Sequence, residues 1–353
     1  MKKAWTLLGA MLLVLVLLAG CGGGESAAPA SSGSSETGGS GAAPAPAEQP
    51  QQEASKYPSK DVEFIVPFGP GGGYDTWART LAPFIEKHLP GDHKVLVRNM
   101  EGAGGITGAQ YLYKAGPEDH IIEIFNVGGM VGTELAGNLP FSLTEFNWLA
   151  QLSVDPQVAA TSPATGFNSF EDMKNAGRDI VVALEGIAVN STMASLLVFE
   201  EYGIKWKMLM HDGKGESVLS MARGDADFSM SSIDSVKQYN NDINGIVVFQ
   251  DEPHPDFPNA KLAKDVGLGH LSDVVSTRRM IGASPNMDPE LKTVLADAIG
   301  KAAEDPEFLQ KLKEIEYDLQ YLNAEDAGKM IETTIGAYSE YQDIIKKFME
   351  ENS

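Results

Sequence analysis

The chain has 353 residues, a formal net charge of −22 at pH 7 and a single cysteine. This acidic balance argues against nucleic-acid binding and against docking on an anionic membrane surface. It does not argue against an anionic ligand, because backbone N–H groups can make a pocket locally positive. One cysteine also excludes an internal disulfide.

The first 20 residues have the features of a lipoprotein signal peptide. Lys2 and Lys3 precede an apolar run at residues 7–18, which is too short to span a membrane comfortably. Small residues then precede Cys21, as in a bacterial lipobox, so we expect cleavage before Cys21 and acylation of its sulfur. The alternatives are a plain signal peptide or a membrane anchor with an incidental cysteine.

Residues 25–56 contain no Val, Ile, Leu, Met or aromatic side chain. Such a segment cannot bury enough apolar surface to offset its ordering entropy. We therefore assign residues 21–56 to an acylated cysteine and a flexible linker. The predicted location is extracytoplasmic, with the chain anchored to the bacterial cell membrane by its lipid. The remaining residues, about 300, suffice for two packed α/β lobes.

Short β-rich runs alternate with helical patterns in the remaining chain, which predicts βα units and parallel sheet. The first part is expected to contain strands at residues 62–66, 94–97 and 121–125, helices at 75–88 and 106–114, and two extended runs within 146–161. The second part is expected to contain strands at 180–184, 206–210, 227–230 and 246–249, and helices at 191–202 and 216–223.

Three patterns follow towards the C-terminus. Residues 274–283 are expected to be extended. Asp288-Pro289 and Asp305-Pro306 each predict the start of a helix, because proline in the first turn lacks only an N–H that would have no partner there. Residues 324–349 form one amphipathic pattern.

The most specific local signal is a glycine-rich loop between the first strand and the first helix. Four glycines occupy the five positions from Gly69 to Gly73, so the backbone can approach a ligand closely and turn its N–H groups towards it. The helix start adds partial positive charge, which predicts an anion-binding loop that needs no basic side chain. It is neither a Walker A loop nor a dinucleotide fingerprint, because no Gly-Lys-Ser/Thr follows and Tyr74 replaces the third glycine. The alternative is a tight βα turn.

A second loop, from Asn99 to Gly105, has the same design and lies between the second strand and the second helix. In a parallel sheet both loops lie at the carboxyl ends of strands, where open α/β sheets bind their ligands. Two such loops on one edge favour a binding site over two coincidental turns.

With these loops, the chain resembles the substrate-binding proteins of the tripartite tricarboxylate transporter system, also called the Bug family. The resemblance covers residues 57–349 in order, and its two glycine loops are its specific part. The matching motifs are Tyr57-Pro58-Ser59-Lys60, Val66 to Asp75, Asn99 to Gly105, Gly224-Asp225-Ala226-Asp227, Phe257 to Gly267 and Asp305-Pro306-Glu307.

The resemblance implies an α/β, two-lobed periplasmic-binding-protein-like (type II) fold with a hinge and an interlobe ligand cleft. Lobe 1 would comprise residues 57–155 plus 276–353, and lobe 2 residues 156–275. The chain would then be a monomeric solute-binding protein, not an enzyme, without a cofactor. It would capture a small carboxylated ligand and deliver it to integral-membrane transporter subunits.

The implied binding residues lie in the two glycine loops and at the facing edge of the second lobe. They are Phe68, Gly69, Pro70, Gly71, Gly72, Gly73, Asp75, Gly102, Ala103, Gly104, Gly105, Asn126, Glu185, Gly186, Ala188, Ser191, His211, Asp212 and Ser231.

Two segments of the second lobe depart from the family pattern. Leu184 to Val189 replaces a Ser-x-Gly-x-Gly-Ser motif, although Ser191 is retained, and His211-Asp212-Gly213 replaces Tyr-Lys-Gly. The acids Glu185 and Asp212 would suit a ligand with an amine or hydroxyl group and oppose a highly anionic one. The alternative is that both acids point to solvent.

Catalytic and metal-binding readings find little support. The six histidines form no His-x-x-x-His pair and there is no second cysteine, so no metal site is expected. We expect the histidines on the surface, with His211 kept as a possible ligand contact. No Gly-x-Ser-x-Gly elbow is present, which disfavours an anion-binding hydrolase or transferase. A ligand-sensing lipoprotein of a signalling system is the stronger alternative.

Overall fold

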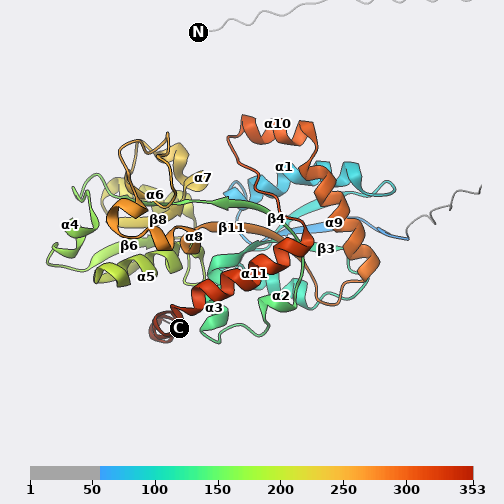
Figure 1. Cartoon of the computed structure of the whole chain (residues 1–353), viewed down its shortest axis with the longest axis horizontal. Helices are drawn as coiled ribbons and strands as arrows, with labels where there is room; N and C mark the ends of the chain where they lie inside the picture. Colours follow the sequence, from blue (N-terminus) through green and yellow to red (C-terminus); the bar gives the residue numbers. More distant parts are fainter. Residues whose placement is uncertain (1–55, 353) are drawn as a thin grey trace, which may run out of the picture. The chain divides into compact units, whose positions relative to one another are not determined.

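The computed structural model describes residues 56–352, which form two β-sheets flanked by helices (Figure 1). The predicted signal peptide, Cys21 and all of the predicted linker except its last residue lie outside the described residues.

The first sheet has the strand order β2-β1-β3-β11-β4. Its strands are β1 (Val62–Val66), β2 (Val95–Asn99), β3 (Ile121–Asn126), β4 (Asn147–Asp155) and β11 (Thr277–Ala283). β1 pairs in parallel with β2 and β3, as predicted, but β11 runs antiparallel between β3 and β4. The predicted parallel pairing therefore holds for β1, β2 and β3 but not for the whole sheet, because a strand from late in the chain returns between β3 and β4.

Helices cover both faces of the first sheet. They are α1 (Gly73–His88), α2 (Ile106–Tyr113), α3 (Val127–Leu135), α9 (Pro289–Ala303), α10 (Pro306–Glu314), α11 (Ala324–Ser339) and α12 (Gln342–Asn352). The predicted helix starts at Asp288-Pro289 and Asp305-Pro306 are confirmed, since each aspartate accepts a hydrogen bond from the backbone N–H two residues later. α1 and α9 share one apolar core with this sheet, which includes Trp77, Leu81 and Leu295.

The second sheet has the order β10-β9-β5-β8-β6-β7. Its strands are β5 (Gln157–Thr161), β6 (Ile180–Leu184), β7 (Trp206–Met210), β8 (Phe228–Ser232), β9 (Asn244–Val248) and β10 (Lys261–Leu262). Its helices are α4 (Phe170–Lys174), α5 (Asn190–Tyr202), α6 (Lys214–Arg223), α7 (Ile233–Val236) and α8 (Ser272–Val275). β6 runs parallel to β7 and β8, whereas β5 is antiparallel to β8 and β9. This sheet is therefore mixed as well.

The chain passes between the two sheets at two neighbouring points. β4 of the first sheet ends at Asp155 and β5 of the second begins at Gln157, with Pro156 between them. On the return, β11 begins at Thr277, which pairs in register with Asp155. Residues 272–275 form the short helix α8, so the prediction that 274–283 is extended throughout is wrong at its start. The Ser276 hydroxyl donates to the Ser272 carbonyl at 2.7 Å and closes this helical turn.

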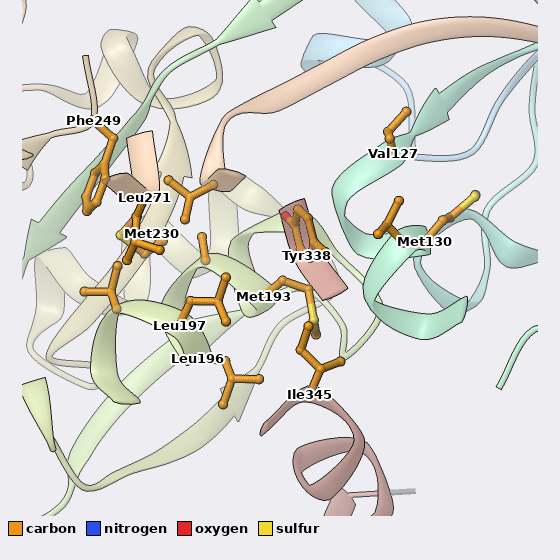
Figure 2. Packing of buried hydrophobic residues seen from close by; sticks show 14 of the residues in the cluster. Val127, Met130, Met193, Leu196, Leu197, Met230, Phe249, Leu271, Tyr338 and Ile345 are labelled. Atoms are coloured by element: carbon orange, nitrogen blue, oxygen red, sulfur yellow. The ribbon is translucent and has the colours of Figure 1, made fainter. Parts of the chain in front are cut away.

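A continuous apolar cluster joins elements of both sheets. Figure 2 shows Val127 and Met130 of α3, Met193 of α5, Tyr338 of α11 and Ile345 of α12, which belong to one cluster. α3 approaches α5 closely because its facing residues are glycines. A methyl group at position 132 would lie 2.5 Å from the Met193 sulfur.

The amphipathic pattern at residues 324–349 was predicted as one run and forms two helices, α11 and α12. Gln342 of α12 donates from its side chain to the Leu135 carbonyl of α3 at 3.1 Å. The Phe348 ring of α12 stacks on Trp206 of β7, with centroids 5.5 Å apart and ring planes at 16°. α12 therefore contacts elements associated with both sheets.

Candidate ligand-binding site

The first glycine loop, Phe68 to Gly73, joins the end of β1 to the start of α1. Gly72 is the N-cap of α1 and has an extended backbone, and none of the described side chains caps this helix end. The N–H groups of the first turn therefore lack a side-chain acceptor and supply the partial positive charge of a helix N-terminus. Gly71 has a φ of +81°, a left-handed conformation that favours glycine.

The Asp75 side chain stabilises the conformation of this loop. Its buried carboxylate accepts hydrogen bonds from the backbone N–H of Gly71, from Arg79 Nε and from Asn99 Nδ2, each at 2.9 Å. Asn99 Nδ2 also donates to the Phe68 carbonyl at 2.8 Å. Burial opposes the charged form of Asp75, but hydrogen bonds from Arg79, Gly71 and Asn99 outweigh it and lower its pKa. The structure thus gives the predicted ligand residue Asp75 a positioning role.

The second glycine loop lies against the second sheet. All four residues from Gly102 to Gly105 have positive φ angles, and the last three form a short 3₁₀ turn that leads into α2. A methyl group at Gly104 would lie 2.5 Å from the carbonyl oxygen of Ala188, which follows β6. Asn126 Nδ2, at the end of β3, donates to the carbonyls of Gly104 and Ala188 at 3.2 and 3.3 Å. Three predicted site residues therefore meet here.

A charged pair lies at the facing edge of the second sheet. Lys214 Nζ, in the first turn of α6, lies 2.8 Å from both carboxylate oxygens of Glu185, at the end of β6. The same ammonium donates to Ser231 Oγ of β8 at 3.1 Å, and Ser191 Oγ donates to Glu185 at 3.2 Å. Sequence reasoning included Glu185, Ser191 and Ser231 but missed Lys214. Its signal was a lysine at the start of a helix that follows a strand after a short connecting loop.

His211 and Asp212 lie near this pair in sequence but differ in environment. His211 is half-buried, and its Nε2 has no hydrogen-bond partner among the described residues. It lines a surface hollow of about 500 Å³ together with Glu216 and Arg223, and no glycine-loop residue lines that hollow. Asp212 is exposed, and its backbone N–H donates to Glu216 at 3.2 Å.

A buried arginine lies beneath the first loop. Arg279 of β11 is fully buried, and its Nη2 would lie 3.1 Å from a methyl group at Gly73. Its guanidinium lies 3.3 Å from Asp155 and 5.1 Å from the centre of the Tyr74 ring. The loop itself contains no basic residue, but the fold places this one, already paired with Asp155, directly beside it. Burial and the Asp155 charge raise the pKa of nearby Asp234 to about 6.

The carboxyl edges of the two sheets meet at two points. Gly104 of the second loop faces Ala188, and a methyl group at Gly73 of the first loop would lie 3.5 Å from Ser235 Oγ of α7. Both glycine loops therefore face the strand ends that carry Glu185 and Ser231. The arrangement combines backbone N–H donors on one side with a paired lysine, a carboxylate and hydroxyls on the other, which suits a small polar ligand.

Other parts of the described chain offer weaker candidates. A second hollow of about 150 Å³ lies beside Trp148, Lys292 and Glu332. Within residues 56–352, no group of three or more His, Cys, Asp or Glu side chains could hold a metal ion.

The expectation of surface histidines is wrong for His120, which is buried and accepts a hydrogen bond from the Ser59 N–H at 2.9 Å.

Comparisons with known proteins match this chain along most of its folded part. Residues 77–348 match the model of the tripartite tricarboxylate transporter family receptor. Protein BugT of Bordetella pertussis is 23% identical over 258 residues, which cover 70% of this chain and 78% of BugT. A protein of Pseudomonas sp., from the tcbD-tcbE intergenic region, is 24% identical over 272 residues, covering 75% of this chain and 80% of the relative.

Solved structures show the same fold. The periplasmic binding protein BugD superposes with a TM-score of 0.72 at 19% identity, covering 82% of this chain and 98% of BugD. MatC from Rhodopseudomonas palustris, with bound malate, gives 0.70 at 20% identity, with 82% and 100% covered. These likenesses confirm the periplasmic-binding-protein fold expected from the sequence.

No helix in residues 56–352 combines the length and apolar character needed to cross a bilayer. The matched family and its structural neighbours are solute-binding proteins rather than enzymes. Since the family match spans well over half of the chain, this chain belongs to the tripartite tricarboxylate transporter family receptors.

Proposed function

We propose that this chain is a lipid-anchored, extracytoplasmic receptor that captures a small carboxylate and delivers it to integral-membrane transporter subunits. The observation that carries the proposal is the meeting of the two carboxyl edges, with both glycine loops facing the strand ends of the second sheet. Two structural neighbours support the ligand class, since MatC was solved with malate and Rpa4515 of R. palustris, at a TM-score of 0.69, with adipate.

Capture in this proposal is a binding event without chemistry. One lobe comprises residues 57–155 plus 276–353 and the other residues 156–275, joined by the neighbouring crossings at Pro156 and Ser276. The first glycine loop holds a ligand carboxylate through backbone N–H groups at the start of α1. The ligand stabilises the closed arrangement of the lobes to the extent that it binds this arrangement more tightly than the open one. The transporter then recognises the closed form.

A thermal-shift panel of mono-, di- and tricarboxylates tests the ligand class, because a ligand that binds only the folded state raises the melting temperature. Gly72→Val then tests the loop. Gly72 has a φ of −79°, and the nearest atom to an added methyl group is the Gly69 carbonyl oxygen at 3.6 Å, so the fold should tolerate a side chain.

That side chain would cover the N–H donors of the loop. Losing even one charge-assisted hydrogen bond should weaken binding by roughly one to two decades. Gly336→Val is the matched control, because Gly336 is exposed on α11 with open space around it. Equal affinity of the two variants, measured by calorimetry, would exclude the loop from the site.

The lipid anchor is tested separately. Cys21→Ser should release the protein from the membrane fraction or leave it with an uncleaved signal peptide, because a serine hydroxyl cannot accept the thioether-linked lipid. The measurement is the apparent mass and the membrane partition of the expressed full chain. Processing and membrane retention equal to the parent would contradict the anchor and leave the binding proposal intact.

A further inference from the structure

Three positively charged side chains lie at the facing edges of the two sheets in the described structure, and each has a carboxylate partner. Arg79 binds Asp75 at 2.9 Å beside the first glycine loop. Arg279 lies 3.3 Å from Asp155 beneath that loop, and Lys214 lies 2.8 Å from Glu185 across from it. None of these side chains therefore offers a free positive charge to a ligand.

Two further carboxylates at these edges lack such a partner. Glu101 is exposed in the second loop, and its oxygens would lie 3.4 Å from a methyl group at Gly69 of the first loop. Asp212 is exposed just before α6. Neither side chain forms an ion pair within residues 56–352. The charge left over at the site is therefore negative.

The first loop offers neutral N–H donors, and the second sheet offers a lysine that is already paired with a carboxylate. Together these groups restrict the charge that a bound ligand can carry. Backbone N–H groups of the first loop can compensate one carboxylate. A second carboxylate would have to approach Glu185 and compete with it for Lys214, and closure of the site would strengthen the repulsion by excluding water. A hydroxyl or ammonium group would instead donate to Glu185, whose side chain remains about 14% exposed.

We infer, on the basis of the proposed function, that the Glu185–Lys214 pair selects a monocarboxylate carrying a hydroxyl or ammonium group and rejects di- and tricarboxylates. Lys214 neutralises and orients Glu185 through the contacts to Glu185 and Ser231. Glu185 receives the ligand's donor group. The two side chains thus determine specificity at the end of the ligand opposite the carboxylate that the first glycine loop holds.

The test uses matched four-carbon probes: succinate, 4-hydroxybutyrate, 4-aminobutyrate and butyrate, with the five- and six-carbon homologues measured in parallel. Wild-type protein should bind a hydroxy or amino acid of one length at least tenfold more tightly than the dicarboxylate of that length. Glu185→Gln keeps the side-chain shape but frees the ammonium of Lys214. It should raise the affinity for the dicarboxylate at least tenfold and weaken binding of the amino acid.

Two further variants make the outcome decisive. Lys214→Met leaves Glu185 unpaired and should shift selectivity in the opposite sense, against dicarboxylates, so the inference is still tested if Glu185→Gln does not fold. Glu200→Gln removes the same charge from an exposed position of α5 and should change neither ratio.

The results separate this inference from the proposed function. A wild-type protein that prefers the dicarboxylates, with ratios unmoved by either site variant, overturns the selectivity while leaving carboxylate capture in place. A wild-type protein that binds no carboxylate of either panel overturns both.

Discussion

Glu123 is a buried carboxyl group without a partner. It lies on β3, the central strand between β1 and β11, opposite Ile65 and Gly282 in register. The side chain is fully buried, and neither oxygen has a hydrogen-bond partner among the described residues. A methyl group at Gly108 of α2 would lie 2.8 Å from Oε1, so the missing side chain there makes room for the carboxyl. Burial raises the pKa of Glu123 well above its ordinary value of 4.5.

We predict that Glu123→Gln stabilises the protein, and increasingly so with rising pH. The raised pKa means that the folded state keeps a proton that the unfolded state loses above about pH 4.5. The wild type therefore loses about 1.4 kcal/mol of unfolding free energy per pH unit, from about that pH up to the folded-state pKa. A carboxamide has the same shape and does not titrate, so the variant escapes this loss and the two proteins converge at lower pH.

Urea unfolding at pH 4.5, 5.5 and 6.5 measures the effect as the difference in unfolding free energy between variant and wild type. Other titrating groups cancel in that difference. Glu200→Gln, which changes an exposed carboxylate, should show no growing difference. If the free energies of Glu123→Gln and wild type run parallel across this range, Glu123 is ionised in the folded state and the reasoning fails.

Two other substitutions test contacts of the fold. Gly104→Ala should lower the melting temperature, since a left-handed φ of +65° costs an alanine about 1–2 kcal/mol and the new methyl group would meet Ala188; an unchanged value would contradict this close approach. Arg178→Met should cost about 1–2 kcal/mol at pH 7, because Arg178 donates to the buried Asp227 at 2.6 and 2.7 Å but is half-exposed. Because Arg178 helps to lower the pKa of Asp227, this cost should disappear as the pH falls through that lowered pKa, and a cost that persists in acid would count against the ion pair.

The sequence predicted those helices and strands whose formation depends mainly on neighbouring residues. The strand at residues 62–66 is confirmed, and α1 begins at Gly73, only two residues before the predicted start. α3 was missed because three of its nine residues are glycines, which disfavour a helix. Its stability comes from packing on α5, a contact with residues about 60 positions away that a local pattern does not contain. The glycine spacing from 128 to 132 was the one available signal.

The candidate site also combines features that the local sequence determines with features that depend on distant residues. The glycine loops could be read directly from the sequence, because their backbone conformations depend on the glycines themselves. The partners of charged side chains could not. Lys214 and Glu185 are 29 positions apart, and Arg279 meets Asp155 across 124 positions. Glu185 was predicted either to face the ligand or to point to solvent, whereas the fold also supplies a lysine that cancels its charge.

The stacked rings of Trp206 and Phe348 give the protein an optical reporter. Phe348 belongs to α12, which is bound to α3, whereas Trp206 belongs to an edge strand of the second sheet. A rotation between the sheets that carried α12 along with α3 would slide these rings past each other and change the water contact of the half-buried indole. Trp77 of α1 and Trp148 of β4 are buried in the part of the fold built on the first sheet and would emit unchanged. The ligand-dependent change in tryptophan fluorescence should therefore come from Trp206, and Trp206→Phe should abolish it.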